Sequence, residues 1–390
     1  MTISRGPQAF PRSEYLRRLA AVKFEMARRE IDTLIVSDQD NITYMTGYTA
    51  RSGYVPQALL VRAAEEEPTF ILRRCDAPAA IYQCFMDRTK IVAYPEALIA
   101  DHKRDGYDAV VDHIVEAGLA NHRIGVELYS LPAKSMEKFK SRLPRATLVD
   151  FTNAVAWIRI VKSDLEIAVM REAAAIADAA IMRGAEVIRP GVSEADASAE
   201  IMAAQIRGVN GKPGTDVYGT IMLCASPRTG TCHIPWTEDV FRVGSQVNLE
   251  VGGTRHGYCA GLMRTYSIGA PSDRLRGVHE IQVEGLEAAL GAVRPGATCS
   301  DVANAFYRTI EKQGLTKESR CGYAHGIGWV EPTASLRDGD MTELKPNMTF
   351  HLMLGNWIDE DFGYTISETF RVSDTGVDVL TTMPRKIFEI

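Results

Sequence analysis

The chain has 390 residues, of which 46% are hydrophobic and 24% charged, and its net charge is −6. One hydrophobic core rarely serves so long a chain, so we expect two domains. Nucleic acids and anionic membranes both need a basic protein face, which the negative charge disfavours. No apolar stretch reaches the ~20 residues of a membrane span.

The first 150 residues alternate between helical and strand patterns. Apolar residues recur at helical spacing over 13–29. Short apolar runs predict strands at 32–38, 57–74 (two strands around an acidic turn), 90–94 and 123–128. This alternation is typical of an α/β domain with a central sheet, which we place at residues 1–160. No glycine-rich phosphate loop follows these strands.

A second domain, which we place at 161–390, begins with a long helix. Ser163-Asp164 predicts the start of this helix, and Arg189-Pro190-Gly191 predicts its end. Further strands are predicted at about 216–224, 246–252 and 256–268, and further helices at about 273–291 and 300–313. The strand-rich segment 348–380 predicts antiparallel hairpins.

The cysteines and the N-terminus both bear on where the protein resides. The seven cysteines form no CxxC pair and are odd in number, which favours buried reduced thiols over disulfides or a zinc site. The first 22 residues show neither a continuous apolar run nor a small-residue cleavage site. We therefore expect a cytoplasmic protein.

Four motifs, in this order, resemble those of the creatinase/prolidase/methionine aminopeptidase superfamily. They are "VKSDLEI" (161–167), the hairpin "EVGGTRHGYCAGLMRT" (250–265), "GYAHGIG" (322–328) and "SETFRV" (367–372). The resemblance covers nearly the whole chain. It implies an α/β (α+β) protein, in which a creatinase-type N-terminal α/β domain precedes a C-terminal "pita-bread" catalytic domain.

The resemblance also bears on metal binding. In metal-dependent members, two Asp, one His and two Glu hold two divalent ions; the matching positions here are Glu250, Gly261, His325, Met353 and Glu368. Hard divalent ions prefer oxygen ligands, which neither a glycine hydrogen nor a thioether replaces. We therefore expect no metal cofactor. A single ion on Glu250, His325 and Glu368 is the open alternative.

Within the superfamily, the sequence resembles the ectoine hydrolases more than it resembles the metal-dependent members. The shared stretches are "IRGVNG" (206–211), "MTFHLMLGNW" (348–357), "TISET" (365–369) and "MPRKIF" (383–388). This resemblance implies a hydrolase that cleaves a C–N bond of a small cyclic amidine, opening ectoine to N-acetyl-2,4-diaminobutyrate. The alternatives are another creatinase-like amidinohydrolase, a single-metal Xaa-Pro peptidase, and an inactive pita-bread binding protein.

A cationic or zwitterionic substrate determines the roles expected of the site residues. Glu250 is the expected nucleophile or base, and Glu368 the counter-ion that offsets burial of an amidinium. His233 matches the proton-shuttling histidine of creatinase and is the expected proton carrier. Further substrate contacts are expected from seven residues: Tyr54, Trp236, Tyr258, Arg264, His325, Met353 and Trp357.

The resemblance implies two further partners. Related two-domain proteins pair as homodimers, with one subunit's N-terminal domain reaching the other's site, and the aromatic-rich loop 46–57 is suited to that role. A deacetylase would act downstream on the ring-opened product.

Overall fold

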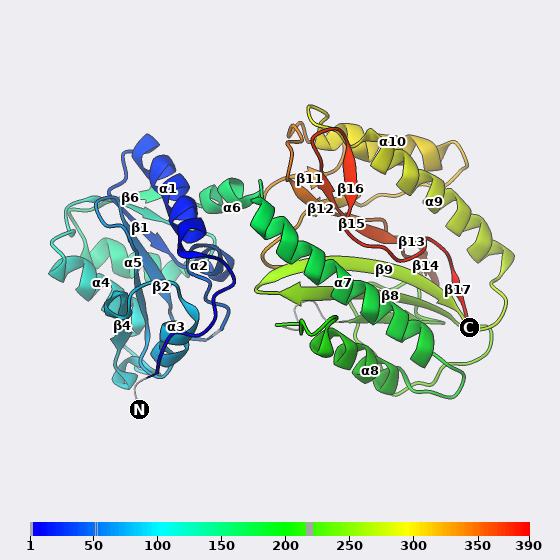
Figure 1. Ribbon diagram of the computed structural model, residues 1–390, viewed down its shortest axis with the longest axis horizontal. Coiled ribbons are helices and arrows are strands. Elements are labelled where there is room, and N and C mark those ends of the chain that lie inside the picture. The colour runs from blue at the N-terminus through cyan, green and yellow to red at the C-terminus, as the bar shows by residue number, and fades with distance from the viewer. Residues whose placement is uncertain (1–2, 51, 53, 216–220) are drawn as a thin grey trace. The chain divides into compact units, whose positions relative to one another are not determined.

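The computed structural model describes residues 3–50, 52, 54–215 and 221–390. The chain forms two compact units, Met1–Arg159 and Ile160–Ile390. Each unit has its own sheets and helices (Figure 1).

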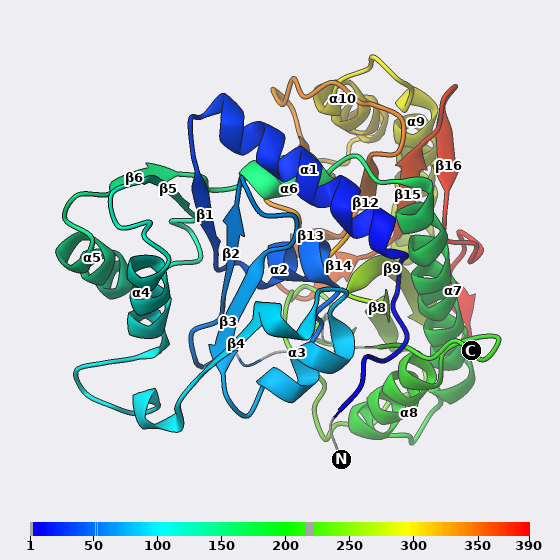
Figure 2. The same cartoon turned by 60° about the vertical axis from the view of Figure 1, so that its left-hand side comes forward.

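The N-terminal unit is built on one sheet of six strands, in the order β4-β3-β2-β1-β5-β6. The strands are β1 Thr33–Val36, β2 Ala58–Arg62, β3 Thr69–Arg73, β4 Ile91–Tyr94, β5 Arg123–Val126 and β6 Thr147–Asp150. Helices α4 Gly106–Glu116 and α5 Ala133–Arg142 pack on one side of this sheet. The helices α1 Arg12–Arg28, α2 Gln39–Thr46 and α6 Ala154–Arg159 gather on the other side (Figure 2), and α3 is Ala77–Gln83.

The C-terminal unit opens with α7, Asp164–Val187, at the predicted position. The Ser163 side chain accepts from the Glu166 amide, and the Glu166 side chain accepts from the Ser163 amide, so the helix start is capped from both directions. Helix α8, Glu194–Arg207, follows without having been predicted. Both helices pack against β8 (Gln246–Arg255), whose partner is β9 (Tyr258–Ser267).

Two sheets form the core of the C-terminal unit. The first has the order β17-β9-β8-β7, with β7 Met222–Ala225 and β17 Phe388–Glu389. The second has the order β11-β10-β12-β15-β16: β10 Gly322–Ala324, β11 Ser335–Leu336, β12 Thr349–Met353, β15 Ser367–Val372 and β16 Val377–Val379. Helices α9 (Asp273–Ala292) and α10 (Cys299–Glu311) cover the second sheet, and β13 (Asn356–Asp359) pairs with β14 (Phe362–Tyr364).

Gly253 allows helix α7 to pack directly against the backbone of β8. A Cβ atom on Gly253 of β8 would lie 1.9 Å from the carbonyl oxygen of Ala173 in α7. Real Cβ atoms do not approach a carbonyl oxygen that closely, so α7 can rest on β8 only because residue 253 has no side chain. This contact fixes the sheet that carries Glu250.

Most predicted elements are confirmed, within a few residues at their ends. The strand predicted at 216–224 begins at Met222 in the structure, and residues 216–220 lie outside the described ranges. All seven cysteines are free thiols, but Cys75 is exposed and Cys232 is only partly buried. Within the described ranges, no helix has both the length and the apolar character needed to cross a membrane.

Candidate active site

A cavity of about 500 Å³ lies within the C-terminal unit. Its described lining combines one acid, one guanidinium and one imidazole with three thioethers and three aromatic rings. These residues are Glu250, Arg320, His233, Met222, Met263, Met353, Tyr323, Trp329 and Trp357. The cavity therefore offers a carboxyl group and a guanidinium on a largely apolar wall.

Glu250 is the single acid of this lining, and strand register places it there. In the antiparallel sheet Glu250 lies opposite Met222 on β7 and opposite Met263 on β9. Residues directly opposite one another share a face of the sheet, so the two methionines flank the carboxyl group. Glu250 is 3% exposed, and its Oε2 has no hydrogen-bond partner in the described chain. Burial raises the pKa of Glu250 to about 8.

His233 lines the same cavity from a loop and is exposed. Its backbone has φ +60°, in the left-handed region that few residues other than glycine adopt, and Cys232 Sγ lies 3.1 Å from its Nδ1. The Trp357 indole on β13 donates to the carbonyl of Thr231 over 2.7 Å and so anchors this loop. Strained residues of this kind cluster at functional sites, which fits the role predicted for His233.

Gly261 is the position of the absent carboxylate, and the His351 ring occupies its place. A Cβ on Gly261 would lie 2.7 Å from Cε1 and 2.8 Å from Nδ1 of His351. His351 is fully buried, and desolvation lowers its pKa well below its ordinary value. A neutral imidazole therefore stands where the resemblance predicts an aspartate in metal-dependent relatives.

His325 is also buried and neutral. Its Nε2 accepts from the Gly261 amide over 3.1 Å, and its Nδ1 donates to the Trp329 carbonyl. Desolvation lowers the pKa of His325 to about 4. Both ring nitrogens are engaged within the protein, and His325 is not among the described residues that line the cavity.

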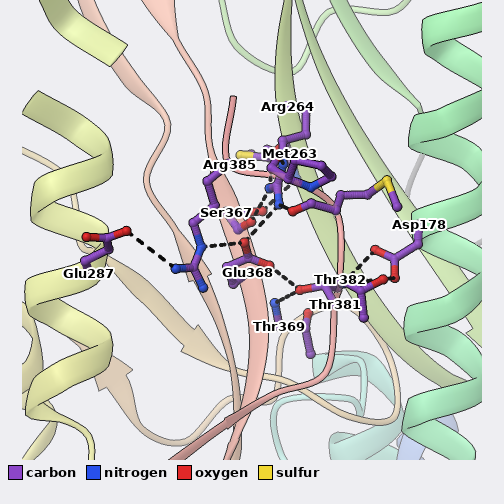
Figure 3. A network of polar contacts seen from close by, with 12 residues as sticks. Asp178, Met263, Arg264, Glu287, Ser367, Glu368, Thr369, Thr381, Thr382 and Arg385 are labelled. Atoms are coloured by element: carbon purple, nitrogen blue, oxygen red, sulfur yellow. Dashed lines mark hydrogen bonds and ion pairs between the residues drawn. The ribbon is translucent and has the colours of Figure 1, made fainter. Parts of the chain in front are cut away.

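Glu368 and Arg264 form a buried ion pair outside the cavity lining. Figure 3 shows Arg264 and Arg385 converging on Glu368, at 2.9 and 3.1 Å from its Oε1, while Thr381 donates to its Oε2. All five N–H donors of the Arg264 guanidinium are used, since four backbone carbonyls complete its shell. They belong to Met263, Ser367, Met383 and Pro384. Neither side chain is directed at a substrate in this arrangement.

The other predicted contact residues divide into two groups. Met353 and Trp357 line the cavity together with Glu250 and His233. Tyr258 is buried and donates to Glu166 over 2.7 Å, and Trp236 packs against the core between α7 and β8. Tyr54 belongs to the N-terminal unit, where it is 74% exposed and its hydroxyl contacts Arg73.

Arg320 and Tyr323 are among the cavity residues that the sequence did not predict. The Arg320 guanidinium lies 4.6 Å from the centre of the Tyr323 ring and donates to Ser335 Oγ over 3.1 Å. Tyr323 is the first aromatic residue of the "GYAHGIG" motif, so its position was available as a signal. No spacing or composition cue singles out Arg320.

Each of the two units matches a known protein family. The profile of Metallopeptidase family M24 matches residues 168–374, and the profile of the Creatinase/Prolidase N-terminal domain matches residues 18–161. The chain is 65% identical over 388 residues to the "uncharacterized hydrolase/peptidase y4tL" of Sinorhizobium fredii, covering 99% of each chain. It is 34% identical to the ectoine hydrolase of Halomonas elongata, covering 97% of this chain and 98% of that one.

Solved structures agree on the fold. A prolidase from Thermococcus sibiricus superposes with a TM-score of 0.85 at 22% identity, covering 96% of this chain and 99% of that chain. The superfamily and fold predicted from the sequence are confirmed: a creatinase-type N-terminal domain precedes a pita-bread domain.

The prediction of no cofactor is contradicted by these matches, because the matching family is one of metallopeptidases. The side chains of this chain nevertheless do not fit a two-metal centre. Of the five matching positions, Gly261 is filled by His351, Met353 is a thioether, and the ligand atoms of His325 and Glu368 are engaged. Among the residues that the structure describes, no three His, Cys, Asp or Glu side chains gather as a metal site. No step proposed for this chain is therefore routed through a metal ion.

The burial of Glu250 predicts a pH-dependent stability. Its pKa is about 8 in the folded protein and about 4.5 when unfolded, so between these values the unfolded chain releases a proton that the folded chain keeps. Stability then falls as pH rises through this range, and Glu250→Gln removes that slope. We expect the stability of Glu250→Gln relative to wild type to rise by up to ~1.4 kcal/mol per pH unit between pH 5 and 8, measured by urea unfolding. Parallel curves for the two proteins would contradict this.

Because Glu368 is paired with Arg264, we expect the Glu368→Gln substitution to lower the stability of the fold and not only the affinity for substrate. Glu368→Gln leaves the fully buried guanidinium without its counter-charge, which costs about 3–5 kcal/mol. At about 2–4 °C per kcal/mol, Tm should fall by roughly 6–20 °C in calorimetry. The control is Glu287→Gln, whose carboxylate is 63% exposed and 4.0 Å from Arg385, with an expected cost of ~1 kcal/mol or less. A wild-type Tm combined with a raised KM would restore Glu368 to its predicted role as substrate counter-ion.

Proposed function

Because the chain belongs to metallopeptidase family M24, we propose that it is a hydrolase of a C–N bond in a small zwitterionic cyclic amidine, with ectoine as the first candidate. The 34% identity to an ectoine hydrolase over nearly the whole chain supports the substrate class. The 65% identical relative carries only the broader description of hydrolase or peptidase.

The observation that carries the proposal is that Glu250 and Arg320 line the same cavity, where Glu250 has no compensating charge of its own. A buried carboxyl with an unpartnered oxygen is costly, and an amidinium N–H supplies both the missing hydrogen bond and the counter-charge. Arg320 supplies a guanidinium for the carboxylate of the same substrate. Ectoine carries both groups, so each end of the molecule meets its complement.

Binding of the cation also prepares Glu250 for catalysis. A nearby positive charge favours the ionised carboxyl and so lowers the pKa of Glu250 from about 8. The proton leaves as the amidinium enters. The bound complex therefore holds a carboxylate beside the carbon that must be attacked.

The reaction then needs one water molecule and two proton transfers. Glu250 takes a proton from water while the water oxygen bonds to the amidine carbon, giving an adduct with one hydroxyl and two nitrogens. The proton held by Glu250 passes to the departing nitrogen and the C–N bond breaks. The hydroxyl proton moves through His233 to the released amine, and the carbonyl of the amide forms. Direct attack by Glu250 on the carbon is the alternative route, which a covalent adduct trapped by acid quench would reveal.

The function is tested by incubating the purified protein with ectoine, hydroxyectoine, creatine and an Xaa-Pro dipeptide, with product masses and bound metal measured in the same samples. We expect ring opening of ectoine with addition of one water. Glu250→Gln should lower kcat by the ~10²–10⁴ typical of a lost general base. Cleavage of the dipeptide alone would make the protein a peptidase, and turnover of none would favour the binding-protein alternative.

Arg320 tests the orientation of the substrate. Arg320→Met removes a charged hydrogen bond worth about 1.5–3 kcal/mol, so KM for ectoine should rise roughly 10- to 150-fold with kcat changed only a few-fold. The exposed Arg337→Met serves as the control and should leave both constants unchanged. An unchanged KM in Arg320→Met would remove Arg320 from the site.

The homodimer, the cytoplasmic location and the downstream deacetylase stay predictions.

A further inference from the structure

Three hydrogen-bonded side chains connect the buried interior of the C-terminal unit to the wall of the cavity. Tyr323 on β10 lies directly opposite His351 on β12, and its hydroxyl is 3.2 Å from His351 Nδ1. His351 Nε2 is 2.8 Å from the hydroxyl of Ser367 on β15. His351 and Ser367 are fully buried, whereas Tyr323 lines the cavity.

The direction of these hydrogen bonds follows from counting donors. The Met263 amide donates to Ser367 Oγ over 2.7 Å, so that oxygen already accepts one bond. The Ser367 proton has one described acceptor, His351 Nε2, and leaving a buried hydroxyl proton unpaired would be costly. His351 Nε2 is therefore the acceptor, and the proton of this neutral ring lies on Nδ1.

The phenol of Tyr323 thus receives a hydrogen bond from His351 Nδ1–H and cannot give one back. The Trp329 side chain also hydrogen-bonds to this hydroxyl, and an indole N–H can only donate, so no further acceptor among the described residues contacts the Tyr323 hydroxyl. Its own proton is consequently directed to whatever occupies the cavity. The chain of hydrogen bonds runs from Met263 through Ser367 and His351 to Tyr323.

We propose that Tyr323 is a substrate-facing hydrogen-bond donor, held in that orientation by the positioning residues His351 and Ser367, and that it donates to the nitrogen that leaves. The second half rests on the proposed amidine hydrolysis. In a planar amidinium both nitrogen lone pairs are delocalised and neither accepts a hydrogen bond. When water adds to the carbon, the departing nitrogen regains a lone pair. The bond from Tyr323 therefore forms only as water adds to the carbon, which lowers the barrier to addition without tightening substrate binding. It is released when the proton of Glu250 takes the same lone pair and the C–N bond breaks.

Gly261 makes room for the same chain of hydrogen bonds. A Cβ at position 261 would lie 2.7 and 2.8 Å from two atoms of the His351 ring, so any side chain there displaces the imidazole. The glycine that removes a metal ligand position is thus what allows His351 to reach Tyr323.

The kinetic test uses ectoine and a matched pair of tyrosines. Tyr323→Phe should lower kcat about 10- to 10³-fold and leave KM within about three-fold, and Ser367→Ala and His351→Leu should lower kcat in the same direction. Tyr364→Phe is the control, because Tyr364 is also buried and its hydroxyl also contacts a histidine, His279, at 2.7 Å. An unchanged kcat in Tyr323→Phe, or an effect confined to KM, overturns the assignment to the leaving nitrogen.

A second measurement works without any substrate. In protein labelled with ¹⁵N-histidine, NMR reports which nitrogen of the His351 ring carries the proton, with His351→Leu identifying the signal. We expect the Nδ1–H form in the wild type and loss of that preference in Ser367→Ala. An Nε2–H form in the wild type overturns the orientation of Tyr323. If ectoine is not hydrolysed but the Nδ1–H form is found, the proposed substrate fails and the oriented donor stands.

Discussion

The cost of burying the Glu250 carboxyl is the constraint around which the C-terminal unit is arranged. Desolvation alone raises its pKa to about 8, because none of the described side chains around it supplies a compensating charge. A group left in that state destabilises the fold until a cation arrives. The flanking methionines make the surroundings of the carboxyl apolar, and their flexible side chains pack around it. Among the described residues the Glu250 Oε2 therefore has no hydrogen-bond partner, a state that suits a positively charged ligand.

That arrangement requires the remaining charges to be kept away from the cavity. Side chains alternate between the two faces of a strand, so Arg264 points away from the face of β9 that carries Met263, and Glu368 points away from the face of β15 that carries Ser367. The two charged neighbours meet there, and the pair is neutral within itself. The cavity lining that the structure describes keeps one carboxyl and one guanidinium. Segregation of charge by strand alternation thus gives the site its polarity.

How much of the structure the sequence could predict depends on how far apart along the chain the contacting residues lie. The start of α7 was predictable because its capping residues, Ser163 and Glu166, lie three positions apart. Glu250 was identifiable because a carboxylate inside an apolar strand rarely lacks a function. The partners of Glu368 were not predictable, because Arg264 lies 104 positions away and joins it only through the packing of β9 against β15. Arg320 gave no signal, since an arginine in a loop has no pattern that distinguishes a ligand from a solvated charge.

Contacts within the protein occupy the positions that match the family's metal ligands. A side chain at position 261 and the His351 ring would fill the same volume, so an aspartate at 261 is incompatible with the present position of His351. His325 keeps its place by accepting from the Gly261 amide and donating to the Trp329 carbonyl, which turns a metal-ligand position into a structural support. Glu368 likewise exchanges a ligand position for Arg264 and Arg385. A side chain at position 261 would clash with His351, and loss of the Glu368 carboxylate would leave Arg264 without its counter-charge. The present arrangement is therefore held in place by the contacts that these ligand-position residues make within the protein.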